Sequence, residues 1–133
     1  MIAIIVLIGV VGFGYYKKAT FKSQNPVATM EVENFGTIKM ELYPDQAPES
    51  VANFIKLANN GFYDGTTFHR IVKDFMIQAG SKDGDGKTGA KISDLKDGGE
   101  DKDYTIKGEF LSNGVTNTIK FEEGTLAMAR ADY

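Results

Sequence analysis

The sequence predicts a mainly β domain with one helix, preceded by a hydrophobic segment. Residues 27–42 alternate between apolar and polar side chains on both sides of a turn signal, which is typical of a β-hairpin with one apolar face. Residues 48–60 carry apolar side chains at helical spacing. Residues 67–79 contain two short strand-like runs around a second turn. Expected strands therefore outnumber expected helices.

Size and composition favour one folded domain. The chain has 133 residues, of which 42% are hydrophobic and 25% charged. Its net charge is −3, whereas nucleic-acid-binding domains usually carry a basic face, so we expect no nucleic acid partner. The chain has no cysteine and one histidine, which excludes thiol catalysis and cysteine-based zinc sites and leaves multi-histidine metal sites unsupported. We expect neither a metal nor another cofactor.

Residues 1–19 are predicted to form a transmembrane anchor. Residues 1–16 contain no charged side chain, and Lys17 and Lys18 follow. Sixteen helical residues reach about 24 Å, short of the roughly 30 Å hydrocarbon core, but the tyrosine pair at 15–16 and the lysine stems can extend the span. A signal peptide and a buried core helix are the alternatives. The signal peptide is disfavoured because a basic start and an A-x-A cleavage site are missing.

Residues 20–26 are polar and unpatterned, and we expect a linker between this anchor and a domain of residues 27–133. In the domain, Pro48 is typical of a helix start and Gly61 of a helix end. The helix is expected to bury an apolar stripe at positions i, i+3, i+4 and i+7, namely Val51, Phe54, Ile55 and Ala58.

Residues 81–103 are rich in glycine and charge and predict a loop. Two motif-like runs in it fail on spacing. A phosphate-binding loop needs glycine at position 81, where the chain has Ser81. A calcium loop beginning there lacks its first carboxylate and has Ile92 in place of the twelfth-position Glu. We therefore expect neither nucleotide nor calcium binding.

The run FHRIVKDFMIQAGS at residues 68–81 places an arginine, Arg70, among apolar residues. If a hairpin closes between its two strand-like halves, Met76 and Gln78 return beside Arg70, and a thioether and an amide join the guanidinium. An arginine on a solvated strand face is the alternative. His69 is expected to be a hydrogen-bonded strand residue.

This run closely resembles the central signature of the cyclophilins, F-H-R-[IV]-x-x-x-F-M-x-Q-G-G-D. Two further runs are similar to the same family: ELYPDQAPESVANFIKLANNGFYDGTTFHR to its first-helix region, and GTLAMARA to its G-x-L-[SA]-M-A-x-A strand. The resemblance covers about Pro26 to Tyr133. It implies an antiparallel eight-stranded β-barrel capped by two helices, with an active groove on its outer surface.

The resemblance implies a role for each matching residue. Arg70 matches the catalytic arginine, Phe75 and Met76 match walls of the proline pocket, and Gln78 matches an amide that holds the substrate backbone. His69 matches a position beside the site. The strand that binds the substrate backbone before proline is matched by Ala129, Arg130 and Ala131. Arg130 replaces the usual asparagine, and Ala79 and Ser81 replace a glycine and an aspartate, which we expect to tune a loop.

The implied activity is peptidyl-prolyl cis–trans isomerisation, with proline-containing peptides and unfolded proteins as partners. An X–Pro amide resists rotation by roughly 20 kcal/mol, and rotation leaves a lone pair on nitrogen. A fixed guanidinium can donate a hydrogen bond to that lone pair only in the transition state. A non-catalytic, membrane-tethered peptide-binding chaperone is the alternative.

The resemblance also implies elements beyond Tyr133: an S-Q-F-F-like strand, a pocket histidine, a second helix and closing strands. We therefore expect this chain to be a fragment with an incomplete barrel, and we expect the family activity of the complete protein. We expect the domain on the extracytoplasmic side, because a tethered isomerase suits the folding of exported chains. Lys17 and Lys18 point the other way.

Overall fold

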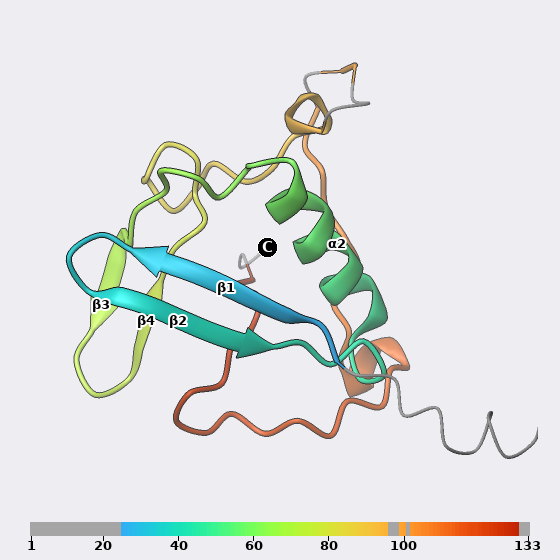
Figure 1. Cartoon of the computed structure of the whole chain (residues 1–133). Helices are drawn as coiled ribbons and strands as arrows, with labels where there is room; N and C mark the ends of the chain where they lie inside the picture. The colour runs from blue at the N-terminus through green and yellow to red at the C-terminus, as the bar shows by residue number, and fades with distance from the viewer. Residues whose placement is uncertain (1–24, 96–98, 101, 131–133) are drawn as a thin grey trace, which may run out of the picture.

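The computed structural model describes residues 25–95, 99–100 and 102–130 (Figure 1). Its elements are β1 (Val27–Val32), β2 (Gly36–Glu41), α2 (Pro48–Asn59), β3 (Arg70–Val72), β4 (Met76–Gln78) and two short 3-10 helices, η1 (Ile92–Asp94) and η2 (Leu111–Asn113). The mainly β prediction is confirmed. The four strands form two separate two-stranded sheets, and the described residues contain no closed barrel.

The first hairpin joins β1 and β2 in six antiparallel pairs, from Val27↔Glu41 to Val32↔Gly36. Along β1, exposed residues alternate with half-buried ones, as the apolar–polar pattern predicts. Leu42 follows β2 and is buried, and its N–H donates to the carbonyl of Pro26 over 2.8 Å. The hairpin therefore continues one residue past its ladder into the core.

Helix α2 begins at Pro48, whose missing N–H costs nothing at this position, and Gly61 follows its end with a φ of 74°. The buried side chains of α2 are Val51, Asn53 and Leu57. The predicted stripe is therefore partly wrong, because Ala58 is exposed and the buried face is turned towards Asn53 and Leu57.

Residues 104–110 run along α2 in the opposite direction, and after η2 the chain turns away from the start of the helix (Figure 1). At the C-terminal end of α2, the Lys56 amino group lies 5.4 Å from the centre of the Tyr104 ring. At the N-terminal end, the Glu109 carboxylate accepts hydrogen bonds from backbone N–H groups of the helix. Further along, the Gln46 side-chain oxygen accepts two hydrogen bonds from Thr118, at 3.0 and 2.8 Å. Residues 104–110 therefore follow the helix without regular secondary structure of their own.

Glu109 supplies the cap that α2 lacks locally. Ala47 precedes the helix and has no side-chain acceptor. The carboxylate of Glu109 accepts from the N–H of Glu49 at 2.9 Å and from the N–H of Ser50 at 2.7 Å. Burial works to raise the pKa of Glu109, but the Ser50 and Glu49 N–H groups outweigh it and hold that pKa below its ordinary value.

The second hairpin joins β3 and β4 in three pairs: Arg70↔Gln78, Ile71↔Ile77 and Val72↔Met76. The sequence predicts longer strands, at 67–72 and 75–79. The structure shortens both, because Thr67 to His69 make no ladder pair and Phe75 lies in the turn.

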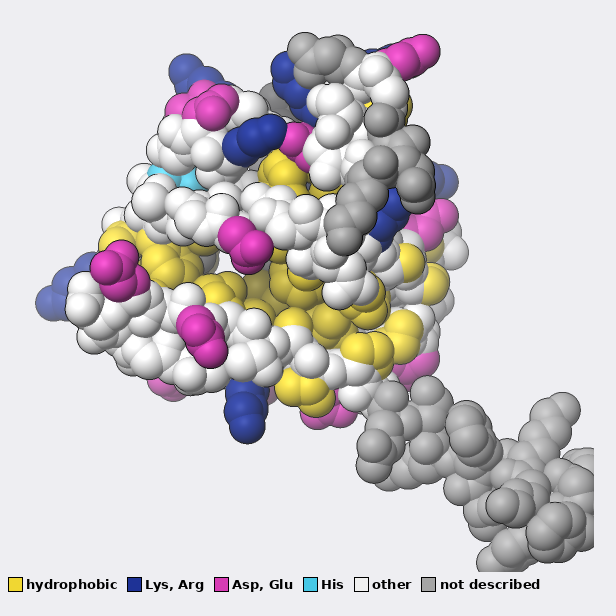
Figure 2. Space-filling model, turned by 45° about the horizontal axis from the view of Figure 1, so that its top comes forward, with side chains coloured by type: hydrophobic (Ala, Val, Ile, Leu, Met, Phe, Trp, Pro, Cys, Tyr) yellow, Lys and Arg dark blue, Asp and Glu magenta, His cyan; other side chains and the backbone are white. Residues whose placement is uncertain are grey.

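The core of the described residues is small. Its buried apolar side chains are Leu42, Val51, Leu57 and Leu95. Figure 2 shows further apolar side chains gathered in a hollow on one face, rimmed by polar atoms. Large apolar side chains are exposed on both hairpins, among them Phe35, Ile71 and Phe75.

The predicted anchor at 1–19 lies outside the described residues, and so does most of the predicted linker, of which only Asn25 and Pro26 are described. Within the part of the chain that the structure describes, no helix combines the length and apolar character needed to cross a bilayer.

Candidate active site

The second hairpin brings Arg70 and Gln78 together as directly opposed partners. Opposed residues of an antiparallel pair project to the same face, and so do residues two apart on one strand. One face of this hairpin therefore carries Arg70, Gln78, Val72 and Met76. The expected meeting of a guanidinium, an amide and a thioether is confirmed at the level of strand register.

The Arg70 side chain is exposed and makes no hydrogen bond or ion pair with any described residue. Its five N–H donors remain available to an outside acceptor. Gln78 and Met76 are half-buried on the same face as the guanidinium. A guanidinium that is unpartnered and flanked by an amide can donate to a small polar ligand.

Phe75 occupies the turn between β3 and β4, and its N–H donates to the Val72 carbonyl over 3.1 Å. Its ring is 78% exposed. The prediction that Phe75 starts a strand is therefore wrong, since the turn takes three residues. Phe75 precedes Met76 at the edge of the hairpin and offers an uncovered aromatic surface.

His69 directly precedes β3 and does not pair with another strand. Both ring nitrogens are buried and have no hydrogen-bond partner among the described residues. The prediction of a hydrogen-bonded strand histidine is therefore wrong. The ring is held by packing, since Gly86 lies directly against it.

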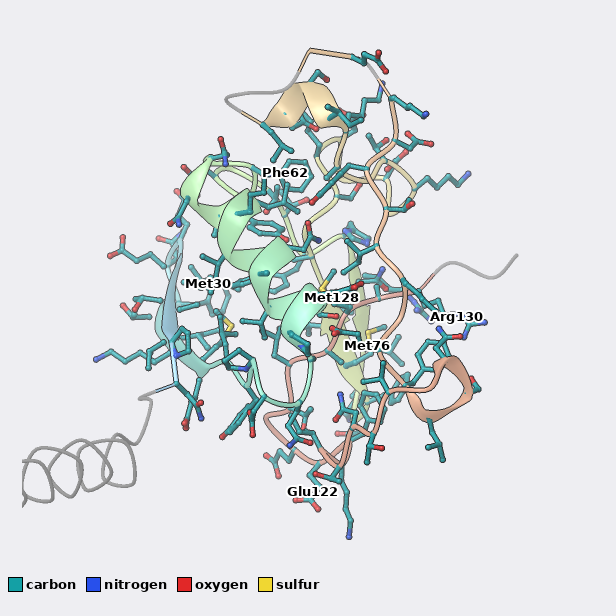
Figure 3. All side chains as sticks on the ribbon, turned by 90° about the vertical axis from the view of Figure 1, so that its right-hand side faces the viewer. Met30, Phe62, Met76, Glu122, Met128 and Arg130 are labelled. Carbon is teal, nitrogen blue, oxygen red and sulfur yellow. The ribbon has the colours of Figure 1, made fainter. Side chains whose placement is uncertain are left out.

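Residues 125–130 do not form a strand, although the family resemblance predicts one there. Ala129 and Arg130 are exposed, and Ala131 lies outside the described residues. The Arg130 guanidinium lies 5.4 Å from the centre of the Phe110 ring, a cation–π arrangement that fixes its direction. In the view of Figure 3, Met76 and Arg130 lie to one side of α2 and Met30 to the other.

The structure does not join all predicted site residues. Arg70, Met76 and Gln78 share one hairpin face, and Phe75 borders it. Arg130 is directed by a different element, and no hydrogen bond links it to the hairpin within the described ranges.

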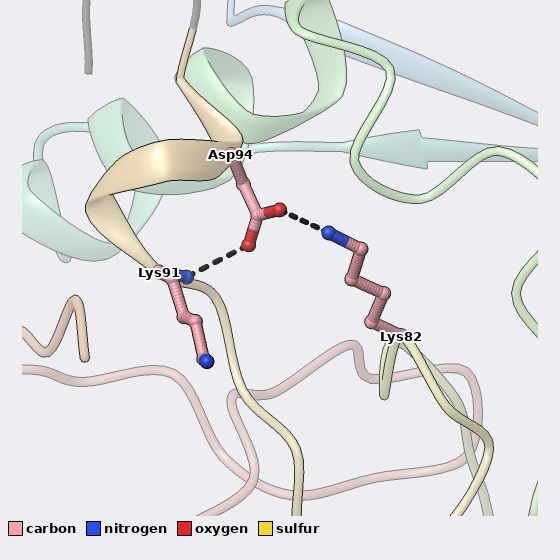
Figure 4. A network of polar contacts seen from close by, with 3 residues as sticks. All are labelled: Lys82, Lys91 and Asp94. Carbon is pink, nitrogen blue, oxygen red and sulfur yellow. Dashed lines mark hydrogen bonds and ion pairs between the residues drawn. The ribbon is translucent and has the colours of Figure 1, made fainter. Parts of the chain in front are cut away.

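The loop that follows the hairpin is more ordered than its composition predicts. The Asp94 carboxylate receives the Lys82 amino group in an ion pair and accepts the N–H of Lys91 at 2.8 Å (Figure 4). The Lys82 amino group, followed by the Lys91 N–H, lowers the pKa of Asp94. Lys82 and Asp94 also line a polar pocket of about 290 Å³ beside Gly61, which none of the predicted site residues lines.

Asp85 organises the nearer part of this loop, a role that the sequence analysis missed. The Thr88 and Lys87 N–H groups and the Ser81 hydroxyl hold the pKa of Asp85 well below its ordinary value. The signal was present in the sequence, because an Asp followed by Gly-Lys-Thr is typical of a turn in which the carboxylate accepts backbone N–H groups two and three residues ahead.

Comparison with protein families matches residues 27–133 to the family described as cyclophilin type peptidyl-prolyl cis-trans isomerase/CLD. Among curated proteins, the chain is 44% identical over 100 residues to peptidyl-prolyl cis-trans isomerase B of Bacillus subtilis, a match that covers 75% of this chain and 59% of the relative. It is 52% identical over 59 residues to the human peptidyl-prolyl cis-trans isomerase-like 1, covering 44% of this chain and 36% of that protein.

The similar protein of Neurospora crassa, also named peptidyl-prolyl cis-trans isomerase-like 1, is 53% identical over 57 residues, which is 43% of this chain and 35% of the relative. The chain therefore spans less than two thirds of these relatives' lengths. A search of the solved structures gave no match.

Proposed function

Because the chain belongs to the family of cyclophilin-type peptidyl-prolyl cis-trans isomerases, we propose that the protein accelerates rotation about X–Pro bonds in peptides and unfolded proteins. The observation that carries this proposal is Arg70. Its guanidinium is exposed and unpartnered among the described residues, and Arg70 is directly opposed to Gln78 on a short hairpin.

The proposed chemistry needs no nucleophile and no proton transfer. The X–Pro amide is planar because nitrogen donates electron density into the carbonyl, and twisting the bond returns a lone pair to the prolyl nitrogen. Arg70 donates an N–H to this lone pair, which exists only in the twisted state, so the contact lowers the barrier instead of stabilising the ground state. Arginine suits this role because it stays charged and its donors are held in a planar fork.

The neighbouring residues are proposed to hold the substrate. Phe75 and Met76 supply apolar surface for the proline ring, and the Gln78 amide binds a backbone group of the peptide. Ala129, Arg130 and Ala131 are proposed to bind the backbone before proline, and His69 to stand beside the site. The register that opposes Arg70 to Gln78 and Val72 to Met76 on one face, with Phe75 next to Met76, supports this arrangement.

We further propose that residues 27–133 belong to an antiparallel β-barrel of the family type, and that residues 1–19 tether it to a membrane with the domain outside the cytoplasm. The run of sixteen uncharged residues supports the tether. Protease treatment of intact cells tests the side: digestion of the domain is expected, and protection until the membrane is opened would place it in the cytoplasm.

The activity is tested by NMR exchange spectroscopy between the cis and trans forms of an Ala-Pro peptide. Native protein is expected to bring exchange from tens of seconds into the sub-second range, and Arg70→Ala to lose most of that gain. Lys73→Ala is the matched control, because it removes an exposed cation in the turn of the same hairpin.

Peptide binding by native protein without faster exchange would establish the non-catalytic chaperone instead. Undiminished exchange by Arg70→Ala would leave the isomerase standing but remove Arg70 from its chemistry.

A further inference from the structure

The loop at residues 81–88, here named the Asp85 loop, is built around one carboxylate. Oδ1 of Asp85 accepts the N–H groups of Lys87 and Thr88 and the hydroxyl of Ser81, each at 2.8 Å. Oδ2 accepts the Thr88 hydroxyl at 3.1 Å. Four hydrogen bonds to one ionised side chain make this a folded unit, because charge-assisted hydrogen bonds are stronger than neutral ones.

The Asp85 loop is anchored at its first residues. Ser81 is only 5% exposed, and its hydroxyl oxygen also accepts the Gly86 N–H at 3.2 Å, which ties the two sides of the loop together. The next residue, Lys82, forms the ion pair with Asp94 (Figure 4). The loop is thus fixed to η1 at one end and closed upon itself.

This anchored loop lies against the residues that lead into β3. A β-carbon built on Gly86 would lie 2.9 Å from Cδ2 and 3.0 Å from Nε2 of the His69 ring, closer than real β-carbons approach. A β-carbon on Gly84 would lie 3.1 Å from Oγ1 of Thr67. Both glycines have positive φ, 72° and 66°. The backbone of Gly86 therefore packs directly on the His69 ring, with no room for a side chain, and the backbone of Gly84 packs tightly on the Thr67 side chain.

The His69 ring is not held by hydrogen bonds to the described residues. Its nitrogens have no hydrogen-bond partner among the described residues, so no directional bond sets the ring's orientation. The contact with Gly86 supplies a steric wall in its place. His69 directly precedes Arg70, and its ring nitrogens are buried, so a displacement of the ring that rotation of the side chain does not absorb is passed to the backbone at the start of β3.

We propose that Asp85 and Gly86 are positioning residues for Arg70, acting through His69. The Asp85 loop holds the ring in place, and the ring holds the first residue of β3 opposite Gln78. The effect on catalysis rests on the proposed isomerase activity, whereas the placement of Arg70 by the Asp85 loop does not depend on it.

A double-mutant cycle tests the contact. Gly86→Ala is expected to push the His69 ring away, shift the Arg70 Nε–H resonance in ¹⁵N NMR spectra, and lower kcat for an Ala-Pro peptide about tenfold or more with little change in KM, because small misplacements of reacting groups are costly. The matched control is Gly65→Ala, since Gly65 has a φ of 74° and no atom near its β-carbon position. It introduces the same backbone strain without the clash.

His69→Ala removes the partner in the clash. In that background Gly86→Ala is expected to change the Arg70 resonance far less than it does in the native chain, so the two effects are non-additive. Additive effects, or equal shifts in Gly86→Ala and Gly65→Ala, would overturn the proposal.

A second pair of variants covers the case in which Gly86→Ala does not fold. Asp85→Asn keeps a carbonyl oxygen for the three bonds at Oδ1, whereas Asp85→Ala keeps none. We expect the native Arg70 resonance to be largely retained in Asp85→Asn and lost in Asp85→Ala, and equal resonances in the two variants would overturn the proposal. If native protein catalyses no exchange, the proposed function fails, while these Arg70 shifts still decide the positioning role.

Discussion

The two hairpins of the molecule share the same turn. In each, the N–H of the third turn residue donates to the carbonyl of the valine that ends the first strand, at 3.0 Å for Phe35 and 3.1 Å for Phe75. The middle residue has left-handed backbone geometry, with φ of 64° at Asn34 and 59° at Asp74. Both phenylalanine rings are largely exposed, by 89% and 78%. Exposure of Phe75 is therefore a property of this turn and is not by itself a sign of a binding site.

The hairpins differ at the third pair from the turn. The first hairpin pairs Met30 with Ile38 there, and the second pairs Arg70 with Gln78. The first also continues for six pairs and the second for three. The same turn thus supports an apolar pair in one hairpin and, at the equivalent place in the other, a polar pair that can bind a ligand. The pair, and not the turn, distinguishes the candidate site.

Replacing the polar pair by the apolar one is the strongest test of this comparison. The double substitution Arg70→Met and Gln78→Ile gives the second hairpin the pair of the first. We expect catalysed X–Pro exchange to fall by about 10²–10³-fold, the usual loss on removing one transition-state donor. Ile38→Gln in the first hairpin is the control and is expected to leave exchange unchanged. A swapped hairpin that still catalyses would refute the role of the pair.

The two exposed phenylalanines give a second, smaller contrast. Phe75→Ala is expected to raise KM for a proline peptide about tenfold or more, because covering an aromatic ring contributes roughly 1.5–3 kcal/mol. Phe35 has a nearly identical environment in its own turn. Phe35→Ala is therefore the control and is expected to leave KM unchanged. The comparison is made by steady-state titration with one peptide. Equal effects would mean that the two rings are equivalent and that neither marks the site.

The turn residues give the smallest effect. For alanine, the left-handed conformation costs about 1–2 kcal/mol relative to the right-handed one. Asn and Asp tolerate the left-handed conformation better. We expect Asn34→Ala to lower the global unfolding free energy by about 1 kcal/mol, since six pairs depend on that turn. Asp74→Ala is expected to lower the global unfolding free energy less than Asn34→Ala does. Its main effect is expected to be faster hydrogen exchange of the β3 and β4 amides, which reports local opening of the short hairpin. The reverse pattern would show that the short hairpin is the more cooperative one.

Local patterns predicted much of the fold. Alternation predicted the first hairpin, and Pro48 and Gly61 predicted the limits of α2 to within about a residue. The return of Gln78 to Arg70 followed from a turn placed between two strand-like runs. In each case the information lies within a few neighbouring residues, where periodicity and turn chemistry act.

The remaining features depend on contacts between distant segments. Nothing near α2 in the sequence shows that Glu109 caps it. The Phe110 ring that directs Arg130 is likewise twenty residues away. The wall that Gly86 places against His69 requires that a loop fold back, which its glycine-rich composition did not reveal. Strand lengths in the second hairpin were overestimated because β-propensity cannot show where a ladder partner stops.

The remote cap on α2 has a consequence for the order in which the chain folds. The acceptor of the Glu49 and Ser50 N–H groups lies 60 and 59 residues further along the sequence. At ribosomal rates of roughly 5–20 residues per second, the helix emerges about 3–12 seconds before its cap is synthesised. During that interval the first turn of α2 has only water as an acceptor and frays, while the local β1–β2 ladder can already close. The N-terminal turn of α2 is therefore expected to be among the last parts of a nascent chain to order.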